Sequence, residues 1–348
     1  MNNLKVNFIE LTGKDIESLN QTDCLYVFDF RSISENMEYD IPAMFKYENL
    51  LPWVLSGMNI CVNEGFGKIN FNKSNHYIIV AKDTDSRVSV YKRLERIKLP
   101  ETIKKIYSGI PHPDSDQYVV QNSMETNVTY SSFVSKNDKI AQKVAFSEYT
   151  PKWEIINEKS TDNILNRYSG MYIKRQFSSG GYCVISPEDL TNSKIQIEDG
   201  HTWYAEACCF GKSCSVQIYK ESSEKMTVFG YANQIIGEGK HFIGAELLRI
   251  NQISLEHKRA IERILQNCFD LLVDYNGFFG LDFIITHSGE IMALELNVRM
   301  TAVTIPTLIF NETKKEKLIF MEDQELIEEN DIVLTYAPDG SADIIRAY

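Results

Sequence analysis

The 348-residue sequence has no apolar run long enough to cross a membrane as a helix, which takes roughly 18 residues or more, so we expect no membrane span. Its first residues, MNNLKVNFIELTGKD, lack the basic and then apolar pattern of a secretory signal. The 7 cysteines include no C-x-x-C pair, so we expect reduced thiols rather than a zinc site or a disulfide framework. Together these absences predict a cytoplasmic protein.

Basic residues are in the minority, with 36 Lys and Arg against 48 Asp and Glu and a net charge of -12. This balance argues against a nucleic-acid partner, which would need a surface of clustered Lys and Arg. The sequence also lacks a G-x-G-x-x-G after its first apolar run, a G-x-S-x-G elbow and an H-E-x-x-H helix. A dinucleotide site, a serine hydrolase and a zinc protease are therefore not expected.

The first part of the chain differs from the rest in its pattern. Short apolar runs at 24–30, 58–62 and 76–81 alternate with helix-like stretches and suit the buried strands of an open, mostly parallel α/β sheet. Further on, a helix is expected to end before Pro151, and a hairpin with a Ser/Gly tip is expected over 171–186. The later segments favour antiparallel strands.

The segment GFFGLDFIITHSGEIMALELNVRM, at 277–300, carries the clearest chemical pattern. Its second half alternates as a half-buried strand does, and the residues that share one face are Ile291, Ala293, Glu295, Asn297 and Arg299. The residues expected on the opposite, core face are Met292, Leu294, Leu296, Val298 and Met300. One face therefore ends in three polar groups.

The turn of this hairpin predicts which residues face each other. If Ser288-Gly289 forms a two-residue loop, counting back along both strands places Asp282 opposite Glu295 and Gly280 opposite Asn297. Opposed carboxylates are destabilising unless a proton or a cation lies between them. Mg2+ prefers carboxylate and amide oxygens, so Asp282, Glu295 and Asn297 predict a magnesium site. The alternative is a solvated acidic face.

Weaker signals lie upstream. The loop 177–181, FSSGG, follows Lys174 and is of the kind whose backbone N–H groups cradle phosphates, although most such loops are plain hairpin tips. Lys139 precedes an amphipathic helix and could equally be a solvated lysine. Glu206 lies in an apolar run, so its carboxylate needs a partner, which could be an adenine amino group, a sugar hydroxyl or a lysine.

The order of these elements resembles that of the ATP-grasp superfamily, in which two α+β subdomains clamp ATP. The matching elements are Lys139, Lys174 with S-S-G-G, Glu206 before a glycine, a long helix, then G-x-D and E-x-N-x-R. The resemblance covers roughly 130–310. It implies an α/β N-terminal domain at 1–130, a first ATP-grasp subdomain at 131–215, and a second subdomain with a C-terminal strand at 216–348.

The resemblance also implies roles for the individual residues. Lys139 and Lys174 look like the lysines that contact the ATP phosphates. The mobile lid looks like Ser178, Ser179, Gly180 and Gly181, and the hinge that reads adenine, largely through its backbone, looks like Glu206, Ala207, Cys208 and Cys209. The ligands of Mg2+ or Mn2+ look like Asp282, Glu295 and Asn297. Arg299 resembles the arginine that steadies the transferred phosphoryl group, so Arg299 and Lys174 are the expected catalytic residues.

The implied activity is ATP-dependent ligation. A carboxylate is phosphorylated to an acyl phosphate, and an amine then forms an amide or peptide bond between amino acids or small peptides, as in the biosynthesis of a specialised metabolite. Three alternatives stay open: a thiol acceptor on a carrier protein, a kinase that stops at the phosphorylated product, and a nucleotide-binding regulatory module without turnover. The sequence names neither the substrates nor the oligomeric state, although dimers are plausible for this superfamily.

The sequence departs from the family pattern at three positions. Ala207 stands where a second hinge acid is common, Ser213 where a ribose-binding acid is common, and Val298 where proline is common. Nucleotide preference is therefore left open, while the expected metal set is intact. Arg249, like Arg299, could clamp a carboxylate or form a structural ion pair.

Overall fold

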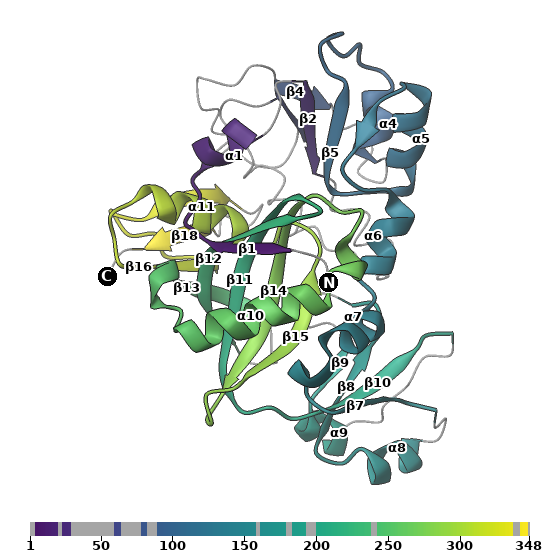
Figure 1. The fold of residues 1–348 in the computed structure, drawn as a ribbon, viewed down its shortest axis with the longest axis vertical. Helices are drawn as coiled ribbons and strands as arrows, with labels where there is room; N and C mark the ends of the chain where they lie inside the picture. Colours follow the sequence, from purple (N-terminus) through teal and green to yellow (C-terminus); the bar gives the residue numbers. More distant parts are fainter. Residues whose placement is uncertain are drawn as a thin grey trace.

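The computed structural model describes residues 4–19, 23–28, 59–63, 78–81, 89–157, 161–178, 183–192, 200–237, 242–336 and 342–346. It arranges their strands in three β-sheets (Figure 1). None of the helices in these ranges has both the length and the apolar character needed to cross a membrane.

The N-terminal sheet is parallel, as the apolar runs predict. Its described strands, in spatial order, are β4 (Ile78–Ala81), β3 (Asn59–Asn63), β2 (Cys24–Phe28), β5 (Lys105–Ile110) and β6 (Glu125–Thr126). Leu25 and Val27 of β2 pack with Ile106 of β5 and with the helices α4 (Val90–Leu94) and α5 (Pro113–Gln121). This small core is separate from that of the large sheet.

Residues 130–149 form two helices, of which the second is the one expected before Pro151. They are α6 (Tyr130–Lys136) and α7 (Lys139–Phe146), and a 3-10 turn over Ser147–Tyr149 ends before Pro151 as predicted. The break occurs at Asp138, because its Oδ1 accepts the N–H groups of Ile140 at 2.9 Å and of Ala141 at 3.2 Å and so starts a new helix.

A four-stranded antiparallel sheet follows. Its strands, in spatial order, are β7 (Trp153–Ile155), β10 (Trp203–Ala207), β8 (Met171–Arg175) and β9 (Val184–Ile185). The helices α8 (Thr161–Arg167) and α9 (Pro187–Asn192) pack against it. Strands β8 and β9 are the expected hairpin.

The largest sheet has nine strands. Eight of them follow in the spatial order β15 (Ile291–Asn297), β14 (Gly277–Thr286), β11 (Gly211–Ser222), β12 (Lys225–Ile236), β13 (Phe242–Leu248), β16 (Lys317–Gln324), β18 (Ala342–Arg346) and β17 (Ile332–Tyr336). Strand β1 (Lys5–Phe8) pairs with the first half of β12, so the N-terminus belongs to this sheet and not to the parallel one.

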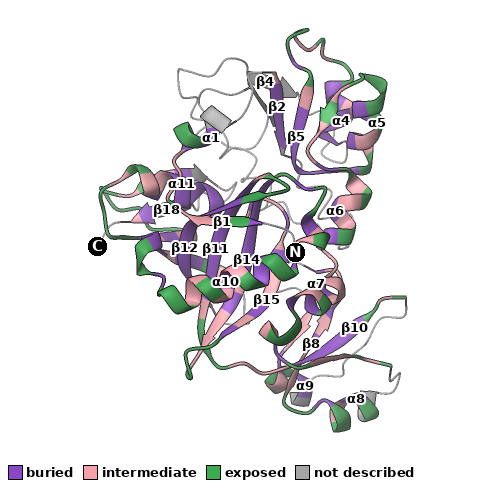
Figure 2. Cartoon of the chain, viewed as in Figure 1, coloured by how far each residue is buried: buried purple, intermediate pink, exposed green. Residues whose placement is uncertain are grey.

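Helices pack onto the large sheet and enclose the main core (Figure 2). They are α10 (Leu255–Asn267) and α11 (Thr304–Glu312), with α1 (Gly13–Leu19) beside β1 and the short 3-10 turns Ile250–Gln252 and Asp270–Leu272. Ile261, Ile264 and Leu265 form the buried face of α10, at helical spacing. Burial is most extensive in the central strands β11, β12 and β14.

The parallel sheet and the large sheet meet at Tyr107 and Gly277. The Tyr107 hydroxyl oxygen accepts the N–H of Phe278 at 2.8 Å. Gly277 has φ +135°, and a Cβ at this position would lie 1.8 Å from the same oxygen. Only glycine allows both the backbone conformation and this close approach.

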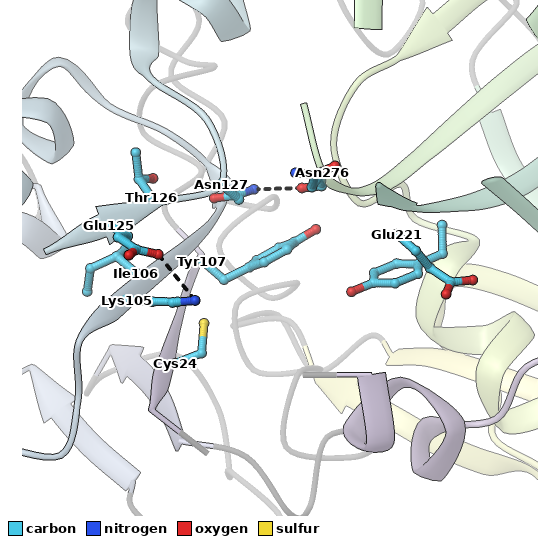
Figure 3. A pocket seen from close by; sticks show the side chains of 10 residues that line it. Cys24, Lys105, Ile106, Tyr107, Glu125, Thr126, Asn127, Glu221 and Asn276 are labelled. Carbon is cyan, nitrogen blue, oxygen red and sulfur yellow. Dashed lines mark hydrogen bonds and ion pairs between the residues drawn. The ribbon is translucent and has the colours of Figure 1, made fainter. Parts of the chain in front are cut away.

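A cavity of about 310 Å³ lies beside this contact (Figure 3). Cys24, Lys105 and Glu125, the first residues of β2, β5 and β6, line one side, and Lys105 and Glu125 form an ion pair at 3.2 Å. Asn127 bridges to the other side by donating to the Asn276 carbonyl at 3.3 Å. The cavity thus lies at the amino ends of these parallel strands, whereas ligands of such sheets usually bind at the carboxyl ends.

Candidate functional site

The hairpin of β14 and β15 pairs its polar residues as predicted, with Asp282 opposite Glu295 and Gly280 opposite Asn297. The predicted two-residue loop is wrong. The Thr286 N–H donates to the Glu290 carbonyl at 2.9 Å, so the loop has one residue more, and its last residue, Gly289, has φ +87°. This extra residue would shift the whole register by one.

A β-bulge restores the register. Asp282 pairs with Glu295, but the next residue, Phe283, pairs with Ala293, so Leu294 is the extra residue of β15. Two deviations from a regular hairpin therefore cancel between the loop and the polar pair.

The bulge also exchanges the faces of β15. Ile291 and Ala293 are buried in the main core, although the regular alternation predicts them beside Glu295. This prediction is wrong because the bulge at Leu294 turns the strand over. Beyond the bulge Leu296 is buried in the core as expected, whereas Leu294 is only partly buried.

The polar residues of this face are linked by hydrogen bonds. Asn297 Nδ2 donates to Asp282 Oδ2 at 2.8 Å, and Arg299 Nη2 donates to Asn297 Oδ1 at 3.1 Å. From β12, Gln234 Nε2 donates to Asp282 Oδ1 at 3.0 Å. Desolvation and the facing Glu295 raise the pKa of Asp282 to about 7. A divalent cation shared by the two carboxylates would remove this penalty.

Lys139, the first residue of α7, reaches this face from the side. Its Nζ donates to Ser178 Oγ at 2.6 Å and lies 3.5 Å from Glu295 Oε2. Lys139 therefore joins the hairpin face to the start of the predicted lid. Ser179, Gly180 and Gly181, the remaining lid residues, lie outside the described residues.

Glu206 lies between two lysines. Its carboxylate forms ion pairs with Lys174 of β8 and with Lys143 of α7, and its side chain is 2% exposed. Burial alone would raise the pKa of Glu206, but the two lysines outweigh burial and hold the pKa at about 2. Of the three partners considered for this buried acid, the structure supplies lysine.

Lys143 is the residue that the sequence interpretation missed. It is fully buried, and burial lowers its pKa to about 8 while Glu206 opposes that shift. Its Nζ also donates to Thr150 Oγ1 at 3.1 Å. Its spacing is the one sequence signal, because Lys143 follows Lys139 by one helical turn and lies on the same face of α7, but spacing does not show that this face packs against Glu206.

The predicted hinge joins the four-stranded sheet to the large sheet. Glu206 and Ala207 end β10, and Cys208 and Cys209 lead toward β11. The Ala207 N–H donates to the Lys152 carbonyl at 2.8 Å, and Cys208 Sγ to the Gly170 carbonyl at 3.1 Å. A role of this segment in reading adenine stays a prediction.

Arg249 has a structural role. It pairs with Glu10 at 3.0 Å, donates to the Thr313 and Lys315 carbonyls at 2.6 and 2.8 Å, and stacks on Phe310 with its guanidinium carbon 4.1 Å from the ring centroid. Arg299 is therefore the better candidate to bind a carboxylate or phosphate.

The donor set of the hairpin fits a hard divalent cation. Among the described residues, no three or more His, Cys, Asp and Glu side chains are grouped to hold a metal. Mg2+, however, usually takes one or two carboxylates and fills its remaining positions with water and phosphate oxygens. Asp282 and Glu295, opposed on adjacent strands, with the Asn297 amide beside them, match that requirement.

Comparisons with known proteins identify the fold. Residues 136–303 match the family model of an ATP-grasp domain. The chain is similar to N5-carboxyaminoimidazole synthetase from Staphylococcus aureus complexed with ADP, with a TM-score of 0.61 and 13% identity, over 98% of this chain and 95% of that chain. Among curated proteins, none matches the sequence significantly.

Two further solved structures share the fold. One is N5-carboxyaminoimidazole synthase from Aspergillus clavatus in complex with ADP and 5-aminoimidazole ribonucleotide, with TM-score 0.59, 8% identity and 94% coverage of both chains. The other is the biotin carboxylase domain of Hydrogenobacter thermophilus 2-oxoglutarate carboxylase with MgADP and bicarbonate, with TM-score 0.58, 10% identity, and 94% and 87% coverage of this and that chain. The predicted fold class, an ATP-grasp fold after a mostly parallel α/β domain, is confirmed.

Proposed function

Since residues 136–303 belong to the ATP-grasp family, we propose that this protein is an ATP-dependent ligase that activates a carboxylate as an acyl phosphate and joins it to an amine. The observation that carries the proposal is the opposition of Asp282 and Glu295, with Asn297 and Arg299 on the same face and Lys139 beside Glu295. Such a face can hold Mg2+ and the phosphates of a nucleotide together.

The reaction consists of two displacements. A carboxylate oxygen of the first substrate attacks the γ-phosphorus of ATP, the bond to the bridging oxygen breaks, and ADP leaves. The amine then attacks the acyl carbon, phosphate leaves with the electron pair, and the amine loses a proton. Mg2+ held by Asp282, Glu295 and Asn297 would neutralise phosphate charge during the first displacement.

The chain's own cations align the reacting groups. Lys139 and Lys174 would bind phosphate oxygens. To do so, Lys139 would leave Glu295 and Lys174 would leave Glu206, their present carboxylate partners. Arg299 would steady the transferred phosphoryl group, since its guanidinium is held on the hairpin face by Asn297. Closure of the lid that begins at Ser178 would exclude water from the acyl phosphate. The segment Glu206–Cys209 would bind adenine.

We favour amino acids or short peptides as substrates. A thiol acceptor on a carrier protein is a less good fit, because the net charge of -12 would repel an acidic partner. A regulatory module without turnover would be expected to have lost a metal ligand, whereas Asp282, Glu295 and Asn297 are all present. The two products, amide and thioester, are separable by mass and by hydroxylamine cleavage.

The test is nucleotide consumption. Purified protein is incubated with ATP, Mg2+ and pools of amino acids and small carboxylates, and ADP, AMP and phosphate are quantified. We expect ADP and phosphate that depend on the pool and are absent from an Asp282→Asn, Glu295→Gln double variant. AMP with pyrophosphate would contradict the mechanism, and ADP with a stable phosphorylated product would identify a kinase instead.

A further inference from the structure

Gln142 of α7 binds the strand that carries two of the predicted metal ligands. Its Oε1 accepts the N–H of Leu296 at 2.9 Å, and its Nε2 donates to the carbonyl of the same residue at 2.7 Å. The Nε2 also donates to the Lys136 carbonyl at 2.9 Å, and the residue is 1% exposed. The side-chain amide thus binds both backbone groups of a single residue, Leu296, one with each of its ends.

The position of Leu296 makes this contact specific. Leu296 lies between Glu295 and Asn297, and β15 is at the end of the large sheet in the strand order. The backbone groups on the outer side of such a strand have no neighbouring strand to pair with. Gln142 takes the place of that strand at Leu296, and Asn137 Oδ1 does so two residues on by accepting the Val298 N–H at 3.1 Å.

Strand β15 needs such support at this point. The bulge at Leu294 interrupts its pairing with β14 immediately before Glu295, and the Asp282 and Glu295 carboxylates repel each other. Both effects favour movement of Glu295 and Asn297 away from Asp282. The two hydrogen bonds of Gln142 fix the backbone of Leu296, and with it the positions of Glu295 and Asn297 on either side.

Helix α7 also ties this strand to the lysines. It carries Lys139, which lies 3.5 Å from Glu295, and one turn later the adjacent residues Gln142 and Lys143, of which Lys143 pairs with Glu206. One helix therefore relates the acidic hairpin to the lysines expected at the phosphates.

We propose that Gln142 is a positioning residue that holds Glu295 and Asn297 of β15 in the geometry that binds the divalent cation. The inference rests on the proposed function, because that function supplies the cation. Gln142 touches neither the cation nor the substrates and acts through the backbone of Leu296. Without the Gln142 amide, the backbone N–H and C=O of Leu296, between the predicted metal ligands, lose this partner.

The test uses Gln142→Met, which keeps the length of the side chain and removes the amide. Binding of MnCl2 in the presence of ADP is followed by the electron paramagnetic resonance of free Mn2+. We expect the affinity for Mn2+ to fall by about 10-fold, as for the loss of other groups that orient metal ligands. In turnover, raising Mg2+ should recover most of the lost rate.

Asn311→Leu is the matched control. Asn311 Nδ2 also donates to two backbone carbonyls, of Leu11 at 2.8 Å and of Phe229 at 2.9 Å, but it lies on α11 and neither of these partners is in β15. This variant should lose thermal stability and keep the wild-type affinity for Mn2+. Equal Mn2+ affinities in Gln142→Met and wild type would overturn the inference about Gln142 and leave the proposed function standing. If the wild-type chain binds no Mn2+ with ADP, the proposed function fails, and the inference with it.

Discussion

Asp282 and Glu295 lie directly opposite each other on adjacent antiparallel strands, with a bulge immediately beside them. Regular cross-strand pairing would make this a destabilising contact. Here the bulge keeps both carboxylates on the polar face while the residues before it turn into the core. The opposed carboxylates therefore destabilise the hairpin locally, at the place where a cation would bind.

This cost predicts a dependence of stability on pH. The pKa of Asp282 is raised from 3.8 to about 7, so the folded protein favours the protonated carboxyl. The resulting stabilisation is complete below the ordinary value and is lost as the pH rises through 7. In EDTA, wild type should lose roughly 1–2 kcal/mol relative to Asp282→Asn between pH 4 and 7, a figure discounted for solvent screening.

Urea unfolding at several pH values in EDTA measures this difference. Mg2+ should restore the stability of wild type above pH 7, because it binds the ionised pair, and should do little for Asp282→Asn. Parallel stability curves for the two proteins would show that Asp282 titrates at its ordinary value.

The second prediction concerns Lys143. Replacing it by Met leaves the buried Glu206 with Lys174 as its one remaining ionic partner among the described residues. Breaking a buried pair from one side typically costs about 3 kcal/mol or more, so the free energy of unfolding should fall by that order. Denaturant unfolding measures it.

Glu206→Gln combined with Lys143→Met is the control for this prediction. The double variant removes the buried carboxylate that has lost one of its two lysines, so it should be more stable than Lys143→Met alone. A lysine that is merely solvated would give a Lys143→Met protein as stable as wild type, which is the outcome that would refute the buried ion pair.

The third prediction concerns the contact between the parallel and the large sheet. Gly277→Ala introduces a Cβ that cannot fit against the Tyr107 hydroxyl and that disfavours φ +135°. It should destabilise the protein by roughly 3 kcal/mol. Tyr107→Phe should cost about 1 kcal/mol, for the lost hydrogen bond to Phe278.

The double variant separates the two effects in thermal unfolding. Tyr107→Phe removes the hydroxyl oxygen, 1.8 Å from the new Cβ, but leaves the ring carbons Cζ and Cε2 at 2.6 and 2.9 Å as well as the backbone strain, so it should recover only part of the lost stability. Full recovery would mean that neither the ring contact nor the backbone conformation of Gly277 carries a cost.

The sequence predicts the pairing of Asp282 with Glu295, but partly for a wrong reason. Counting from a two-residue loop reaches the correct pair because the loop and the bulge at Leu294 add compensating residues. Alternation then misplaces Ile291 and Ala293, since a period of two cannot reveal where a strand turns over. The alternation of a strand can be read from neighbouring residues. The position of a bulge, in contrast, depends on how both faces of the sheet are packed.

The pattern of the sequence does not identify Lys143 and Gln142 as residues of the site. A lysine and a glutamine on a short helix read as solvated residues, and only the tertiary fold places them against Glu206 and Leu296. The parallel sheet, by contrast, follows from apolar runs that need no such information. Strand β1 was beyond prediction because its partner β12 lies more than 200 residues away.

The most direct test of the account follows an oxygen atom. The carboxylate identified by ADP formation is labelled with 18O in its carboxyl group and turned over with ATP, Mg2+ and the amine. An acyl phosphate predicts that one 18O per turnover appears in inorganic phosphate, detected by 31P nuclear magnetic resonance, and that the Asp282→Asn, Glu295→Gln variant transfers none. Phosphate without 18O, or label recovered in AMP, would contradict carboxylate phosphorylation at this site.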